Sequence, residues 1–73
     1  MKGHLRKRSF RLAGHATSVA LEAEFWAVLE AAAAHKGESL AALVSRIDDE
    51  RAAQKLPLAS ALRLKALKHS KEL

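Results

Sequence analysis

The sequence predicts a mainly α-helical chain with one short β-strand ahead of three helices. Three observations lead to this prediction. Apolar and polar residues alternate with period two between residues 9 and 21, as they do in a half-buried strand. Apolar residues then recur at helical spacing as far as about residue 69. Gly37 and Pro57 divide this helical part into three segments.

The strand segment contains a change of phase. Phe10 and Leu12 are even-numbered, whereas Val19 and Leu21 are odd-numbered. One continuous strand would place the two sets on opposite faces of the sheet. We therefore expect a bulge or a turn at residues 13–15, where a glycine permits the backbone to change direction.

Each helical segment has an apolar stripe and a boundary signal. The first begins near Glu22 and ends at Gly37, and the second begins at Ser39, a residue type that caps helix N-termini well. The third runs from about residue 58 to residue 69, after Pro57. The apolar stripes consist of Phe25, Trp26, Leu29, Leu40, Leu43, Val44, Ile47, Leu58, Leu62 and Ala66. These stripes predict a helical core, which we expect to form across two subunits.

Length and composition favour one small domain that assembles with a second copy. The chain has 73 residues and no cysteine, so disulfides cannot stabilise it. A single strand also needs a partner for its backbone groups. We therefore expect a homodimer in which one strand from each subunit forms an antiparallel ribbon across a two-fold axis. A tetramer built from two such dimers is the alternative.

The sequence gives no reason to expect a cofactor, a metal or a membrane. The four histidines do not have the spacing of metal ligands; they are His4, His15, His35 and His69. No apolar run approaches the roughly 20 residues of a membrane-spanning helix. We therefore expect a cytoplasmic protein.

The positive charge is concentrated near the N-terminus. The formal net charge is +5, and residues 1–20 contain no acidic residue. The basic residues of this segment are Lys2, Arg6, Lys7, Arg8 and Arg11. We expect residues 1–8 to form a flexible basic arm and residues 9–73 to form the domain. A basic arm on a helical body is typical of proteins that bind a polyanion such as DNA; a solvated tail is the alternative.

The residues from Arg8 to about His69 also resemble a known family. The matching motifs are Gly14-His15-x-Thr17-Ser18-Val19, Glu24-Phe25-Trp26, Gly37-x-Ser39-Leu40 and Ser60-Ala61-Leu62-Arg63. In this order they resemble the ribbon-helix-helix family of small alphaproteobacterial proteins, which is similar to the Arc/MetJ-type repressors. The resemblance implies a dimeric transcription regulator, a repressor, whose β-ribbon enters the major groove of double-stranded DNA.

The direction of the strand predicts which residues meet the DNA. If Thr17, Val19 and Leu21 face the helices, the residues between them face outward. Two of those outward residues are alanines, which donate no hydrogen bond to a base, so base reading by this segment alone should be weak. The candidate DNA-binding residues are Arg6, Lys7, Arg8, Ser9, Arg11, His15, Ala16, Ser18, Ala20 and Ser39.

Three of these candidates have specific expected roles. Arg11 is suited to a bidentate contact with guanine, with a phosphate contact or a solvated side chain as the alternative. Ser39 begins a helix whose free backbone N–H groups can hold a phosphate, although the neighbouring Glu38 opposes this. His15 either contacts phosphate or the partner strand, or stabilises the turn through a hydrogen bond.

Other interpretations of the sequence lead to different functions. Phe25 and Trp26 could stack on bases, but their helical spacing favours the core. The acidic run at residues 48–50 has no nucleophile or metal ligand beside it, so we expect ion pairs with Arg46 and Arg51 and no enzymatic activity. The main alternative is a dimeric protein-interaction module, antitoxin-like, with weak or no DNA binding. A membrane-surface role for the basic third helix is a further alternative.

Overall fold

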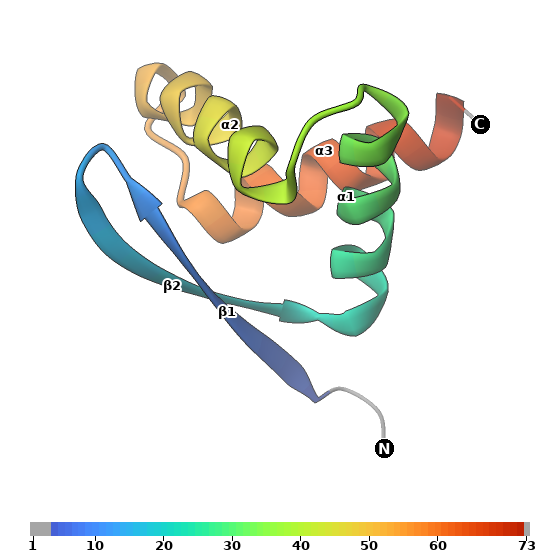
Figure 1. The fold of residues 1–73 in the computed structure, drawn as a ribbon, viewed down its shortest axis with the longest axis horizontal. Helices are drawn as coiled ribbons and strands as arrows, with labels where there is room; N and C mark the ends of the chain where they lie inside the picture. Colours follow the sequence, from blue (N-terminus) through green and yellow to red (C-terminus); the bar gives the residue numbers. More distant parts are fainter. Residues whose placement is uncertain (1–3, 73) are drawn as a thin grey trace.

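The computed structural model describes residues 4–72 of the chain, with side chains described for residues 4–70. A β-hairpin is followed by three helices (Figure 1). The elements are β1 (Leu5–Leu12), β2 (His15–Glu22), α1 (Ala23–His35), α2 (Leu40–Gln54) and α3 (Leu58–Glu72). The expected order of strand and three helices is therefore confirmed, whereas the expectation of one short strand was wrong.

The hairpin forms within a single chain. β1 and β2 pair antiparallel from Leu5 opposite Glu22 to Leu12 opposite His15. The two residues of the turn, Ala13 and Gly14, have φ angles of 52° and 83°. A two-residue turn with two positive φ angles matches the right-handed twist of the paired strands.

The second half of β1, residues 9–12, agrees with the predicted alternation, whereas the first half was not predicted because it is exposed on both faces. Residues 5–9 are all exposed, so they show no alternation of apolar and polar types. Residues 5–8, expected in a flexible arm, form the first half of this strand. Residues 1–3 of the expected arm lie outside the described residues.

The change of phase in the sequence corresponds to the hairpin turn at Ala13 and Gly14. In the observed register, each even-numbered residue of β1 lies opposite an odd-numbered residue of β2. Phe10 and Leu12 therefore share one face with Val19 and Leu21. Three of these four side chains are buried, and Phe10 is half-buried against the same core. We call this side of the hairpin, which faces the helices, the inner face.

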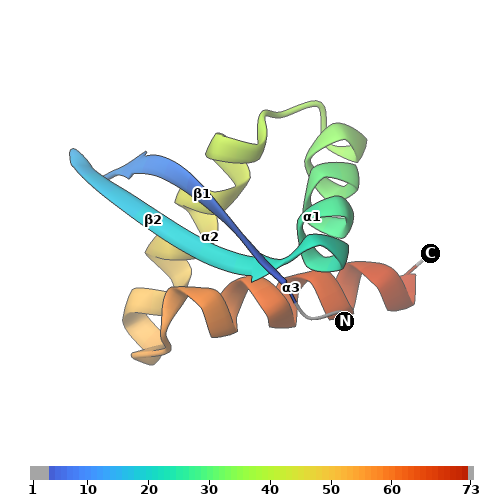
Figure 2. The ribbon, with the colours of Figure 1, turned by 90° about the horizontal axis from the view of Figure 1, so that it is seen from below.

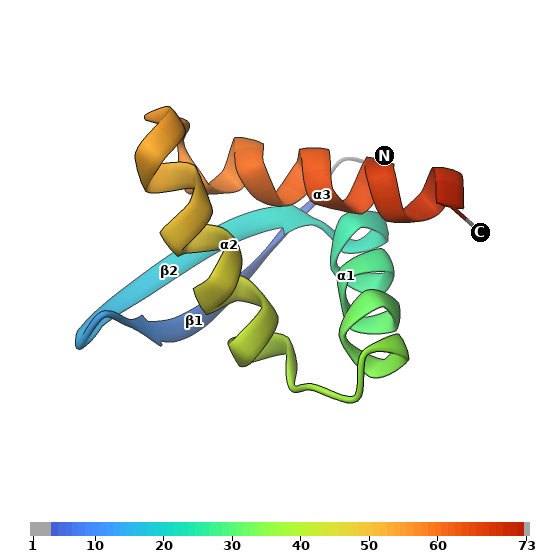
Figure 3. The same cartoon turned by 90° about the horizontal axis from the view of Figure 1, so that it is seen from above.

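All three helices lie on the inner face. Seen from below, the hairpin passes in front of α2, and α1 stands beside the end of β2 (Figure 2). Seen from above, α3 runs along one side while α1 and α2 flank the space over the hairpin (Figure 3). The buried core consists of Leu12, Val19, Leu21, Trp26, Leu29, Ala32, Ala33, Leu43, Val44, Ile47, Ala61, Leu62 and Ala66. One chain thus brings together the apolar stripes that we expected to meet across two subunits.

The helix boundaries follow from local hydrogen bonding. At the end of α1, Gly37 has a φ of 70°, and the N–H of Glu38 donates to the carbonyl of Ala33 at 3.0 Å. This closure is a Schellman motif, which glycine favours. The hydroxyl of Ser39 then accepts from the N–H of Ala42 at 3.0 Å, so the predicted cap of α2 is confirmed. Within the described part of the chain, no helix has the length and apolar character needed to span a bilayer.

Candidate nucleic-acid interface

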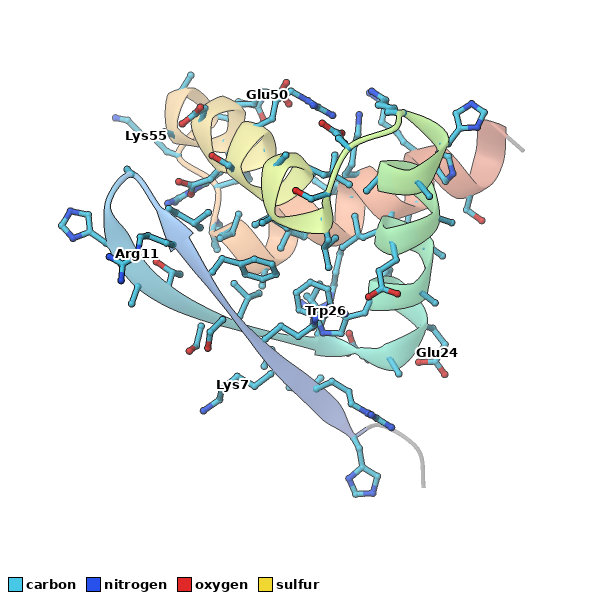
Figure 4. All side chains as sticks on the ribbon, in the orientation of Figure 1. Lys7, Arg11, Glu24, Trp26, Glu50 and Lys55 are labelled. Carbon is cyan, nitrogen blue, oxygen red and sulfur yellow. The ribbon has the colours of Figure 1, made fainter. Side chains whose placement is uncertain are left out.

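The face of the hairpin that points away from the helices is the candidate interface, which we call the outer face. Its side chains are fixed by the strand register and by alternation along each strand. They belong to Leu5, Lys7, Ser9, Arg11, Ala16, Ser18, Ala20 and Glu22. The predicted outward direction of β2 is therefore confirmed. Lys7 projects away from the helices, and Arg11 lies near the turn (Figure 4).

The middle of the outer face is polar and narrow. Ser9 and Ser18 lie opposite each other in the register, and their Oγ atoms are 3.1 Å apart. Arg11 lies opposite Ala16, and its guanidinium donates to the carbonyl of Gly14 at 3.3 Å. This contact engages only one of the five N–H donors of an arginine. The guanidinium of Arg11 is therefore held at the turn end of the hairpin, and its other N–H donors can bond a ligand.

Two of the predicted DNA-binding arginines lie on the opposite face. Arg8 forms an ion pair with Glu30, and its guanidinium lies 5.4 Å from the ring centre of Trp26. Arg6 lies opposite Leu21, and its backbone carbonyl accepts a hydrogen bond from Trp26 Nε1 at 2.8 Å. The structure therefore separates Arg6 and Arg8 from the outer-face cations.

The flank of the hairpin carries a shallow pocket of about 410 Å³ beside the first turns of α1. Its lining residues are Arg6, Lys7, Arg8, Ala23, Trp26, Ala27 and Glu30. Because Arg8 and Glu30 pair across this region, the acidic side chain offsets part of its positive charge.

The predicted phosphate anchor at the start of α2 lies apart from the outer face. α2 packs on the helix side of the hairpin (Figure 2). Next to the Ser39 cap, Glu38 accepts from Arg46 through both carboxylate oxygens, at 2.7 and 2.8 Å. The hydrogen bonds from Arg46 lower the pKa of Glu38 below its ordinary value. A carboxylate held ionised beside this helix start disfavours a phosphate there.

The remaining candidates fall at the turn and on α2. His15 is exposed at the turn end of β2, opposite Leu12. In the acidic run, Asp48 pairs with Arg51 at 2.9 Å, which confirms one expected ion pair. Arg46 instead pairs with Glu38, which precedes its helix.

The sequence analysis also missed the contact that fixes the base of the hairpin. The guanidinium of Arg63 on α3 donates to Glu22 at 3.0 Å and lies 5.8 Å from the ring centre of Phe25. A backbone hydrogen bond and the hydrogen bond from Arg63 lower the pKa of Glu22. Because the two residues are far apart in the chain, no local spacing could indicate this pair. It links α3 to the junction between β2 and α1.

Comparisons with known proteins agree with this architecture. The family model described as a ribbon-helix-helix domain matches residues 5–70. A solved structure of an uncharacterized protein from Bordetella pertussis Tohama I is similar, with a TM-score of 0.81 and 39% sequence identity. That match covers 90% of this chain and 55% of the other, so this chain spans about half the length of that relative. No curated protein matches the chain. With nearly all of its described residues inside the family match, the chain belongs to the ribbon-helix-helix family.

Proposed function

We propose that the chain is a transcription regulator, a repressor, that binds double-stranded DNA as a homodimer and places the outer face of its hairpin in the major groove. Ribbon-helix-helix domains are non-enzymatic regulators that typically bind DNA as dimers. The observation that carries the proposal is the outer face itself. It is an exposed two-stranded ribbon with Lys7, Arg11 and two serines on one side, and the helices pack against part of its other side.

The dimensions and chemistry of this face suit the major groove. The groove is about 12 Å wide and admits a two-stranded ribbon. Lys7 and Arg11 supply charge, while Ser9 and Ser18 supply hydroxyl groups that can donate or accept. Ala16 and Ala20 are small enough to let the backbone approach closely. In this proposal Arg11 contacts a guanine, because its guanidinium can bond both acceptors on that base.

The need for a strand partner, from which the sequence predicted a homodimer, is met within one chain. β2 already has a partner in β1, so the strand pairing of one chain needs no second copy. Within the described residues, each strand of the two-stranded sheet has one edge without a strand beside it. Pairing two copies through these edges would make a four-stranded sheet, about 14 Å across its backbones and too wide for the groove. In the proposed homodimer each copy therefore keeps a two-stranded outer face, and the two copies read two half-sites. Family membership supports a dimer.

A protein-interaction module is the second candidate function. Ala16 and Ala20 offer no hydrogen bond to a base, and Leu5 at the end of the outer face is 52% exposed. These features suit an antitoxin-like partner surface better than a base-reading surface. The two functions are distinguished by whether duplex DNA binds at all.

The experiment is a DNA titration followed by fluorescence anisotropy, using a site selected from random duplexes and an unrelated duplex. Arg11→Ala should weaken binding to the selected site by roughly 5- to 150-fold, the equivalent of about 1–3 kcal/mol for one bidentate base contact, and should weaken the unrelated duplex much less. Lys68→Gln is the matched control, because it removes one charge from an exposed residue of α3. Equal losses of DNA affinity in Arg11→Ala and Lys68→Gln would show that Arg11 contributes only its positive charge. No binding to any duplex at low salt would exclude the DNA function and leave the interaction module.

A further inference from the structure

Two histidines that are distant in the sequence lie together at one end of the molecule. His35 is the last residue of α1, and His69 lies in the last turn of α3. Their ring centres are 6.2 Å apart, and the ring planes are inclined by 57°. His35 is exposed and His69 is half-buried, so solvent reaches the pair. The proposed DNA interface uses neither residue.

We propose that His35 and His69 form a two-imidazole site for a divalent transition-metal ion, Zn²⁺ in the first instance. Metal–nitrogen bonds to histidine are about 2.0–2.1 Å long, so a ring centre lies about 3.2 Å from a bound ion. Two rings bound to one ion therefore have centres up to about 6.4 Å apart. The observed separation of 6.2 Å lies within that limit, and a tetrahedral angle at the ion requires the ring centres to move about 1 Å closer, to about 5.2 Å.

The helix ends provide a favourable setting for a cation. The C-terminus of a helix carries a partial negative charge from its unpaired carbonyl groups. His35 is the last residue of α1 and His69 lies in the last turn of α3, and these two helices pack against each other. Lys36 and Lys65 lower the pKa of nearby Glu38 and so bring positive charge to this region, which opposes a metal ion. The site is therefore weaker than a closed structural zinc site.

The coordination shell contains only two protein ligands. Among the residues that the structure describes, no third histidine or carboxylate joins the pair to complete a metal-binding group. Water would take the remaining positions on the ion, as it does in open zinc sites. Such a site binds reversibly and responds to the concentration of free metal.

Metal binding here would fasten α3 to α1. α3 also supplies Arg63, which bonds Glu22 at the base of the hairpin. An ion held by His35 and His69 would therefore stabilise the helix that supports β2. The inference concerns the helical end of the molecule and does not depend on the proposed DNA function.

The test uses the full chain, zinc chloride and NMR of the imidazole ¹⁵N nuclei. The signals of His35 and His69 should shift together and saturate at one equivalent, while those of His4 and His15 stay unchanged. The thermal unfolding midpoint should rise with zinc, because an ion that binds the folded chain stabilises it. His35→Gln and His69→Gln should each abolish the response of the remaining partner and the rise in midpoint. Both variants keep a helix-compatible residue, and His15→Gln is the matched control, which should respond like the unmodified chain.

Three results would overturn the proposal. One is that none of the histidines responds to zinc at concentrations up to a large excess. Another is that all four respond alike, which would indicate unspecific binding to exposed imidazoles. The third is that His69 keeps its full zinc response in the His35→Gln variant, because a shared ion requires both rings.

Discussion

Trp26 is one of the residues that connect the hairpin to the helices, and its replacement gives a direct test of the fold. The side chain is 4% exposed, and its ring centre lies 5.9 Å from that of Phe10 on β1. Its Nε1 donates to the carbonyl of Arg6 at 2.8 Å, and Arg8 covers its ring. A single side chain of α1 therefore contacts several positions along β1.

The size of the expected effect follows from this burial. Removing a buried tryptophan side chain costs about 3–5 kcal/mol, because both transfer energy and packing are lost. A chain of 73 residues has a free energy of unfolding of about 4–11 kcal/mol. Trp26→Ala should therefore remove a large share of this stability. Trp26→Phe keeps most of the ring and loses the hydrogen bond to Arg6, so it should cost about 1–2 kcal/mol.

The assay is urea unfolding followed by circular dichroism, because the protein has one tryptophan and the variants lose its fluorescence. The expected order of destabilisation is Trp26→Ala first, then Phe25→Ala, then Trp26→Phe. Phe25 is the control, since it is the neighbouring aromatic residue of α1 but is only half-buried. An unchanged unfolding midpoint in Trp26→Ala would show that the ring is exposed and would return it to the candidates for base stacking.

Three further predictions concern the turn, a helix cap and an ion pair. Gly14→Ala should destabilise the chain by about 1–2 kcal/mol in urea unfolding, because a φ of 83° is unfavourable for alanine. The added Cβ would meet no atom within 4 Å, so steric contact adds nothing to this cost. Ala13→Asn should instead raise the unfolding midpoint, since asparagine tolerates the positive φ at this position. Ser39→Ala should cost about 1 kcal/mol through loss of the cap, whereas Ser39→Asp should leave the midpoint nearly unchanged. The pKa of Glu38 is lower in the folded chain than its ordinary 4.5, so its pairing with Arg46 contributes stability above that value, and this contribution is lost as the pH falls through the folded pKa. Unfolding free energies measured between about pH 6 and pH 3 should fall less steeply in Glu38→Gln, and an identical slope would contradict the assignment.

The sequence predicted the helices well because their signals are local. Gly37 and Ser39 mark the junction between α1 and α2 through hydrogen bonds within a few residues. Pro57 likewise precedes α3, and its carbonyl accepts the N–H of Ala61 at 3.0 Å. The orientation of β2 was also predictable, because burial of Val19 and Leu21 imposes period-two alternation.

The first half of β1 and the tertiary ion pairs could not be predicted in the same way. Residues 5–9 of β1 are exposed, so hydrophobic alternation does not mark them. Their strand conformation depends on pairing with β2 and on the contact of Trp26 with the carbonyl of Arg6. The Arg63–Glu22 contact and the approach of His35 to His69 also have no signal in the local sequence, because the partners are far apart in the chain. These contacts exist only once α3 has packed against α1.

The hairpin changes the physical reason for a dimer. A chain with one strand would need a second copy to fold, whereas here β1 pairs with β2 and the core closes within one chain. The proposed DNA binding gives a separate reason for a second copy. One chain places Lys7 and Arg11 on the outer face, and each phosphate neutralised contributes a log–log salt slope of only about −0.9. Two copies double these contacts and impose the spacing of two half-sites. Under the proposed function, dimerisation should therefore depend on DNA binding and should have a smaller effect on folding.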